Sequence, residues 1–106
     1  MQEITATELK EKMDAGEDLV LIDVRNPDEF AFAKIEGAKL IPFGEVMARA
    51  DEFESDKDTV VMCRSGVRSA RVIEFLESRS GGGRYFNLAG GILSWSDEVD
   101  PSVPKY

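Results

Sequence analysis

Histidine is absent from the 106 residues, and cysteine occurs once, as Cys63. Without histidine the chain cannot assemble a Ser-His-Asp triad or a Cys-His pair. One cysteine and no histidine also exclude an internal disulfide and, in practice, a structural zinc site, so we expect no metal and no cofactor. A single free thiol agrees with a reducing compartment.

Long apolar runs are missing as well. The longest, such as LVLI at 19–22, are far too short to span a membrane. Positions 1–13 lack the basic and then apolar regions of a signal peptide, so we expect a cytoplasmic protein. The chain begins with its own Met1, which favours a stand-alone protein over a domain excised from a longer one.

Positive charge is scarce: 13 Lys and Arg face 21 Asp and Glu, a net charge of -8. General affinity for nucleic acid needs a basic surface, so we expect no nucleic-acid and no membrane partner. The acidic residues are interpreted as a solvated surface. The length, with 42% hydrophobic and 32% charged residues, predicts one globular domain over 1–106, by default a monomer.

Short apolar segments alternate with helical patterns along the chain, which predicts an α/β domain with a mostly parallel sheet. Thr5 and Glu8 form a capping-box pattern, and the glycines near 80–83 end a helix. Strands are predicted over 18–24, 38–42, 58–63 and 84–88. Helices are predicted over 5–16, 26–35, 43–53, 69–79 and 90–99.

Cys63 stands at the carboxyl end of a predicted strand, where parallel sheets bind their ligands. If the segment after it curls round the sulfur, its backbone N–H groups form an anion-binding nest. Gly66 supplies the conformational freedom for that curl, and a helix beginning near Ser69 points its positive end at the same place.

Arg64 and Arg68 add positive charge to this loop. An ordinary thiol has a pKa of about 8.5 and is only a few per cent thiolate at neutral pH. The loop therefore predicts an activated, solvent-reachable thiolate that receives anionic substrates. The alternatives are that Cys63 is a small buried hydrophobe and that the arginines are surface residues paired with carboxylates.

Four motifs resemble those of the single-domain rhodaneses, the thiosulfate sulfurtransferase family, in the family's order and along essentially the whole chain. They are LIDVRNPDEF (21–30), KIEGAKLIP (34–42), CRSGVRS (63–69) and NLAGGILSW (87–95). The resemblance implies a five-stranded central sheet with helices on both faces. The ending WSDEVDPSVPKY is further similar to the rhodanese-like C-terminal domain of adenylyltransferases that serve molybdopterin or thiamine synthesis.

The resemblance also implies a mechanism. Cys63 is the expected catalytic residue and carries the transferred sulfur as a persulfide. The expected substrate-binding residues are Arg64, Ser65, Gly66, Val67, Arg68 and Ser69. The donor is thiosulfate or another sulfane, and the acceptor is a thiol, cyanide in vitro, or a sulfur-carrier protein.

Some residues depart from the family pattern or are interpreted structurally. Lys34 stands where many members have a histidine that is not catalytic. Asp23 and Arg25 are expected to tie loops together, with a place for Arg25 at the site mouth as the alternative. Trp95 is expected to pack the last helix on the core.

Two other functions stay open. One is a non-catalytic rhodanese-like interaction or carrier module. The other is a phosphatase or arsenate reductase of the related fold, whose loop from cysteine to arginine is one residue longer than the six residues from Cys63 to Arg68.

Overall fold

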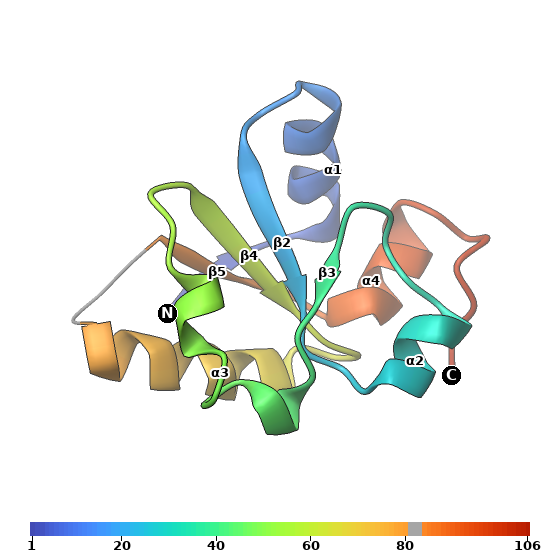
Figure 1. Cartoon of the computed structure of the whole chain (residues 1–106). Coiled ribbons are helices and arrows are strands. Elements are labelled where there is room, and N and C mark those ends of the chain that lie inside the picture. The colour runs from blue at the N-terminus through green and yellow to red at the C-terminus, as the bar shows by residue number, and fades with distance from the viewer. Residues whose placement is uncertain (81–83) are drawn as a thin grey trace.

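In the computed structural model, which describes residues 1–80 and 84–106, five parallel strands form one sheet in the order β1-β5-β4-β2-β3 (Figure 1). The strands are β1 (Gln2–Ile4), β2 (Leu19–Asp23), β3 (Lys39–Leu40), β4 (Asp58–Met62) and β5 (Tyr85–Leu88). The α-helices are α1 (Ala6–Asp14), α2 (Pro27–Phe32), α3 (Val67–Ser80) and α4 (Gly91–Glu98). The predicted parallel α/β fold is confirmed.

The two central strands, β2 and β4, are apolar on both faces because helices cover both sides of the sheet. One core cluster joins Leu21, Val60 and Met62 to helices α1 and α4. A second cluster joins Ile22, Val61 and Cys63 to helix α3. In Figure 1, α3 crosses the sheet on the side opposite α1 and α4. Trp95 packs α4 on the first cluster, as predicted.

The first helix begins with the capping box that the sequence predicts. The Glu8 N–H donates to the Thr5 hydroxyl at 3.1 Å, and the Thr5 N–H donates to the Glu8 carboxylate at 2.9 Å. Such a cap stabilises a helix by about 1 kcal/mol. It fixes the turn that carries the chain from β1 into α1.

The structure differs from the predicted elements in several places, and helix α2 ends at Phe32, three residues before its predicted end. Residues 43–53 form two short 3₁₀ helices, η1 (Phe43–Glu45) and η2 (Ala50–Phe53), in place of an α-helix. The strand β1 was not predicted, because two of its three residues are exposed and leave no apolar pattern. Helix α3 begins at Val67, two residues before the predicted start. The predicted loop at 80–83 lies mostly outside the described residues.

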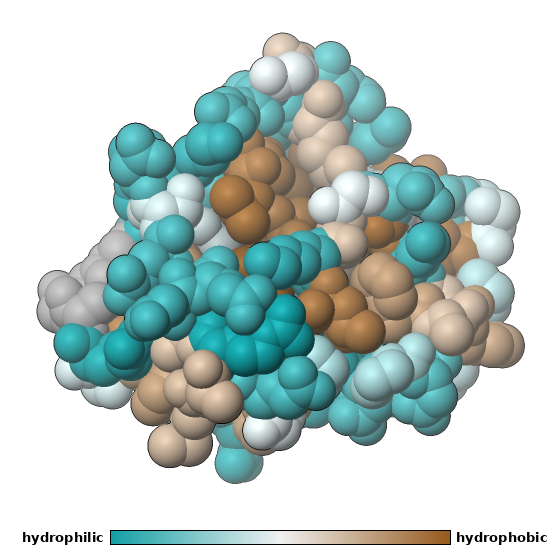
Figure 2. Space-filling view, in the orientation of Figure 1, coloured by the Kyte–Doolittle hydropathy of each residue, from teal (hydrophilic) through white to brown (hydrophobic). Residues whose placement is uncertain are grey.

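The surface is mainly polar. Figure 2 shows hydrophilic side chains over most of one face, with apolar side chains reaching the surface over the half-buried start of β2. Among residues 1–80 and 84–106, no helix is both long and apolar enough to cross a bilayer.

Candidate active site

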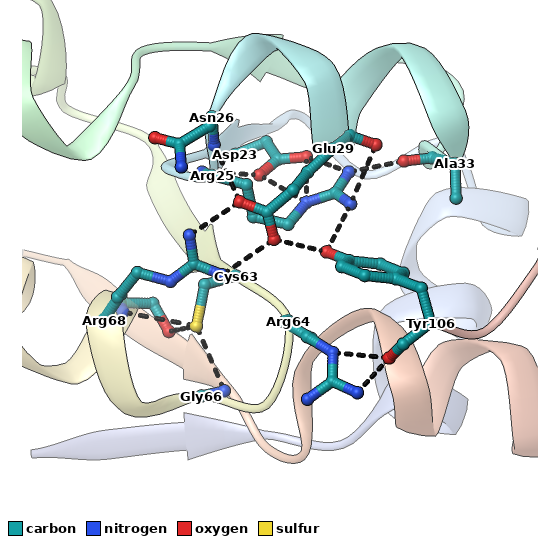
Figure 3. Close-up of polar contacts among 11 residues, drawn as sticks. Asp23, Arg25, Asn26, Glu29, Ala33, Cys63, Arg64, Gly66, Arg68 and Tyr106 are labelled. Carbon is teal, nitrogen blue, oxygen red and sulfur yellow. Dashed lines mark hydrogen bonds and ion pairs between the residues drawn. The ribbon is translucent and has the colours of Figure 1, made fainter.

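Cys63 directly follows β4, and the chain then turns back over its sulfur before entering α3. The Gly66 N–H donates to the Cys63 Sγ at 3.1 Å, and the Ser69 N–H lies 3.5 Å from the same atom (Figure 3). Gly66 has φ +105°, a conformation that residues with a side chain rarely adopt. The predicted nest therefore forms, with glycine at its tightest point.

The nest differs from the prediction in how many amides it uses. Within the described chain, only the N–H groups of Gly66 and Ser69 bond to the sulfur. The side chains of Ser65 and Val67 face solvent, and that of Val67 is 61% exposed. The loop thus leaves further N–H groups free of the sulfur itself.

The sulfur is not solvent-reachable in this structure, contrary to expectation, because Cys63 is only 1% exposed. It lies on the face of the sheet that α3 covers, and the loop closes above it. The arginines after the cysteine add to this cover: Arg68 extends past the sulfur toward α2, and Arg64 extends toward the C-terminal residue (Figure 3). Burial of this kind belongs equally to the alternative of a small buried hydrophobe.

The first two carbonyl groups of the loop, those of Cys63 and Arg64, accept hydrogen bonds from the first turn of α4. The N–H of Ile92 donates to the Cys63 carbonyl at 2.9 Å, and the N–H of Leu93 donates to the Arg64 carbonyl at 3.2 Å. A Cβ at Gly91 would lie 2.4 Å from the Arg64 oxygen and 2.5 Å from the Cys63 oxygen. The second glycine of the NLAGG motif, Gly91, therefore lets α4 approach the loop closely enough to hold it.

A buried polar chain lies behind the sulfur. The Ser69 hydroxyl is 3.3 Å from the Cys63 Sγ and donates to the Asn87 Oδ1 at 2.6 Å. The Asn87 Nδ2 in turn donates to the Gly66 carbonyl at 3.1 Å. Ser69 and Asn87 are almost fully buried, so this chain fixes the floor of the loop.

Arg68 is held by a carboxylate from α2. Its two terminal nitrogens donate to the two oxygens of Glu29 at 2.8 and 2.9 Å. The bidentate bond from Arg68 lowers the pKa of Glu29 to about 2. The pKa of Arg68 is raised above its usual value, mainly by the bond to Glu29 and also by the nearby Cys63. The paired alternative is therefore the one found for Arg68.

The C-terminal residue joins the same group. The Tyr106 hydroxyl donates to Glu29 at 2.7 Å, and the guanidinium of Arg64 donates to the Tyr106 main-chain oxygen through two nitrogens. The Arg64 guanidinium carbon also lies 5.1 Å from the centre of the Tyr106 ring. Both arginines of the loop thus have partners outside it.

Asp23 and Arg25 form a fully buried ion pair, with 2.7 Å between the Arg25 Nη2 and the Asp23 Oδ2. Arg25 also donates to the carbonyls of Glu29 and Ala33 and to the Tyr106 hydroxyl. Its predicted structural role is confirmed. It reaches the rim of the site through Glu29 and Tyr106, and within the described residues none of its hydrogen bonds goes to the sulfur.

Three residues of the site were not predicted from the sequence: Glu29, Asn87 and Tyr106. Asn87 had a signal, since it is a polar residue inside the apolar strand segment 85–88. Glu29 had a weaker one, because it completes a capping box with Asn26 at the start of α2. Tyr106 had none, because its contacts depend on how the last residues fold back.

Comparisons with known proteins agree with this fold. A family model described as the rhodanese-like domain matches residues 5–98. The sulfurtransferase of Allochromatium vinosum is 36% identical, over 97% of this chain and 95% of its own length. The crystal structure of a rhodanese-like domain protein from Staphylococcus aureus has a TM-score of 0.83 and 34% identity, and the match covers 100% of this chain and 99% of that one.

The predicted similarity to a domain of larger enzymes is also found. The adenylyltransferase and sulfurtransferase UBA4 of Debaryomyces hansenii is 30% identical over 86% of this chain, and the match covers 22% of UBA4. With the family model matching most of the sequence and the fold matching over its whole length, the chain belongs to the family of rhodanese-like domains.

Proposed function

We propose that this chain is a sulfurtransferase that moves a sulfane sulfur from thiosulfate, or a related donor, to a thiophilic acceptor through a persulfide on Cys63. The observation that carries the proposal is the nest, in which two backbone N–H groups point at the only cysteine of the chain. Sulfurtransferase relatives of nearly the same length support it.

The chemistry proceeds in two displacements. The Cys63 thiolate attacks the outer sulfur of thiosulfate, the S–S bond breaks, and sulfite leaves with the bonding electron pair. The product is Cys63–S–S⁻, whose terminal charge the loop from Arg64 to Ser69 binds through N–H groups not used by Sγ. An acceptor nucleophile then attacks the terminal sulfur, and the Cys63 thiolate leaves. No proton changes hands at the reacting atoms, so no histidine is needed.

Access to the sulfur requires movement, because Cys63 is buried beneath its own loop. Arg64 and Arg68 are both part-exposed, and long side chains change rotamer rapidly on the surface. We propose that an anionic donor displaces these side chains from Tyr106 and Glu29. The persulfide has no second cysteine to resolve it, so an external acceptor must remove its sulfur and the kinetics are ping-pong.

The burial of Cys63 favours one second candidate, a rhodanese-like module that carries sulfur slowly or does no chemistry. A phosphatase or arsenate reductase remains the less favoured alternative, because the six-residue loop is short for a tetrahedral oxyanion. Aryl-phosphate hydrolysis faster than sulfur transfer would point to that alternative.

Intact-mass measurement after incubation with thiosulfate tests the proposal. We expect one added sulfur atom that a reductant removes, and none on Cys63→Ser. An acceptor series of cyanide, a small thiol and a sulfur-carrier protein then shows where the sulfur goes. A wild-type mass that stays unchanged would contradict the sulfurtransferase and favour the module.

The remaining expectations are proposals of the same kind. We propose one domain over residues 1–106, acting as a monomer in the cytoplasm, with no metal and no cofactor. Its partners are a small sulfane donor and a thiol or carrier-protein acceptor. Neither nucleic acid nor a membrane is among them.

A further inference from the structure

The Ser69 hydroxyl lies between two acceptors but has one proton to donate. It is 2.6 Å from the Asn87 Oδ1 and 3.3 Å from the Cys63 Sγ. The orientation of the Asn87 amide follows from its Nδ2, which donates to the Gly66 carbonyl at 3.1 Å and so turns Oδ1 toward Ser69. In this arrangement the proton is on the Asn87 side, and a protonated Cys63 thiol donates to the Ser69 oxygen.

Ionisation of Cys63 changes the hydrogen bonding between its sulfur and the Ser69 hydroxyl. A thiolate no longer donates, and at 1% exposure it has almost no water to solvate it. Its fixed donors are the Gly66 N–H at 3.1 Å and the longer Ser69 N–H at 3.5 Å. Rotation about the Ser69 Cβ–Oγ bond brings a third donor to the sulfur without any movement of the backbone.

We propose that Ser69 is a two-position hydrogen-bond donor. Its hydroxyl donates a hydrogen bond to Asn87 while Cys63 is a thiol, and to the sulfur while Cys63 is a thiolate. Asn87 is then a positioning residue, because it accepts the Ser69 hydrogen bond until the sulfur becomes charged. This inference rests on the proposed function, and it extends the role of Ser69 from binding the transferred sulfur to supporting the charge on Cys63.

The Ser69 hydroxyl changes its acceptor again during sulfur transfer, as the negative charge moves between the two sulfur atoms. In the persulfide the negative charge is on the terminal sulfur, so the hydroxyl returns to Asn87. When an acceptor attacks that terminal sulfur, the S–S bond breaks and its electron pair goes to the Cys63 Sγ. The hydroxyl then donates to the departing thiolate, which lowers the barrier to discharge.

The first test compares Ser69→Ala with the wild type in two assays. One is the pH dependence of alkylation by iodoacetamide; the other is single-turnover discharge of the persulfide to cyanide. Loss of a bond to a charged sulfur predicts an alkylation midpoint about one pH unit higher and discharge roughly tenfold slower. Ser96→Ala is the matched control, because Ser96 is a buried helical serine that donates to the Val103 carbonyl at 2.7 Å. We expect the alkylation and discharge rates of Ser96→Ala to stay within about twofold of those of the wild type.

The second test is Asn87→Ala. It removes the acceptor that competes with the sulfur for the Ser69 hydroxyl, so the hydroxyl can donate its hydrogen bond to the sulfur at all times. The alkylation midpoint is expected to move the opposite way, down by roughly half a pH unit. Opposite shifts in the two variants support the proposal. It is overturned if both variants shift upward, as general loosening of the loop would require, or if Ser69→Ala shifts nothing.

The two proposals fail in different assays. If wild type gains no sulfur from thiosulfate, the proposed function fails, while the alkylation profiles still report on Ser69. If wild type forms the persulfide but Ser69→Ala discharges it at the same rate, only the two-position donor is contradicted.

Discussion

Glu29 neutralises the positive charge nearest the sulfur. Its carboxylate binds both terminal nitrogens of Arg68 and also accepts from the Tyr106 hydroxyl (Figure 3). Any anion that binds Arg68 must therefore compete with Glu29. One carboxylate on α2 thus offsets the positive charge of Arg68 beside Cys63.

Glu29→Gln should raise the preference of Cys63 for anionic reagents. With Arg68 released, we expect the ratio of alkylation rates by iodoacetate and iodoacetamide to rise about threefold to tenfold. Glu52→Gln is the matched control, because Glu52 binds Arg49 through two nitrogens at 2.6 and 3.0 Å in an exposed ion pair outside the site. An unchanged ratio in Glu29→Gln would mean that Arg68 contributes no field at the sulfur.

The same carboxylate makes stability depend on pH at the acid end. The pKa of Glu29 falls to about 2 in the folded chain, through its bond to Arg68, from an ordinary value near 4.3. The stabilisation is therefore complete above about pH 5 and is lost as the pH falls toward 2. Allowing for solvent screening of a part-exposed pair, we expect roughly 1–2 kcal/mol.

Urea unfolding of wild type and Glu29→Gln at several pH values measures this contribution. The difference in unfolding free energy should be largest at neutral pH and should shrink below about pH 4. A difference that stayed constant down to pH 2 would contradict the assignment of the ion pair.

Helix α4 holds the loop after Cys63 through hydrogen bonds to the Cys63 and Arg64 carbonyls, and Gly91 lies closest to these carbonyls. Its φ of +59° and the 2.4–2.5 Å that would separate a Cβ from the loop carbonyls leave no room for a side chain. Gly91→Ala should therefore lower the unfolding free energy by about 2–4 kcal/mol and slow persulfide loading. Gly44→Ala is the control, since a Cβ there meets nothing within 4 Å and its change should stay within about 0.5 kcal/mol. Thermal unfolding compares the stability of the two variants, and intact-mass measurement with thiosulfate follows their persulfide loading.

The sequence predicts an element well where burial leaves a repeating pattern. The central strands β2 and β4 are evident because both of their faces are covered, and α1 and α2 are evident from their caps. β1 is not evident, since its backbone is held by pairing with β5 while two of its three side chains face solvent. In 43–53, Val46, Ala50 and Phe53 have helical spacing, yet the segment folds as 3₁₀ turns after Pro42.

The features of the candidate site also fall into those that the sequence predicts and those that it does not. The nest could be predicted because one strand, one glycine and one helix start are consecutive in the chain. Glu29 and Tyr106 could not, because they meet the loop only after α2 and the last residues fold against it, 39 and 42 positions from their arginines. The burial of the sulfur depends on this same tertiary cover.

Over the whole molecule, a net charge of -8 surrounds a site that carries two arginines. Charges beyond about 8 Å are largely screened at physiological salt, so Arg64 and Arg68 should govern the approach of a small anion. We expect thiosulfate to load Cys63 about twofold more slowly when salt rises from about 20 to about 200 mM. Iodoacetamide, which is neutral, supplies the comparison and should be insensitive to salt. Faster loading at high salt would show that the overall negative charge dominates.

The order of the strands has a consequence for association between molecules. In the described chain, the sheet ends at β1 on one side and at β3 on the other, with three and two residues respectively. Such short edges offer few unpaired backbone groups, and the charged residues Glu3 and Lys39 lie on them. Strand-to-strand growth into fibres needs long, flat, uncharged borders, so this architecture resists aggregation even though its interior strands are rich in valine and isoleucine.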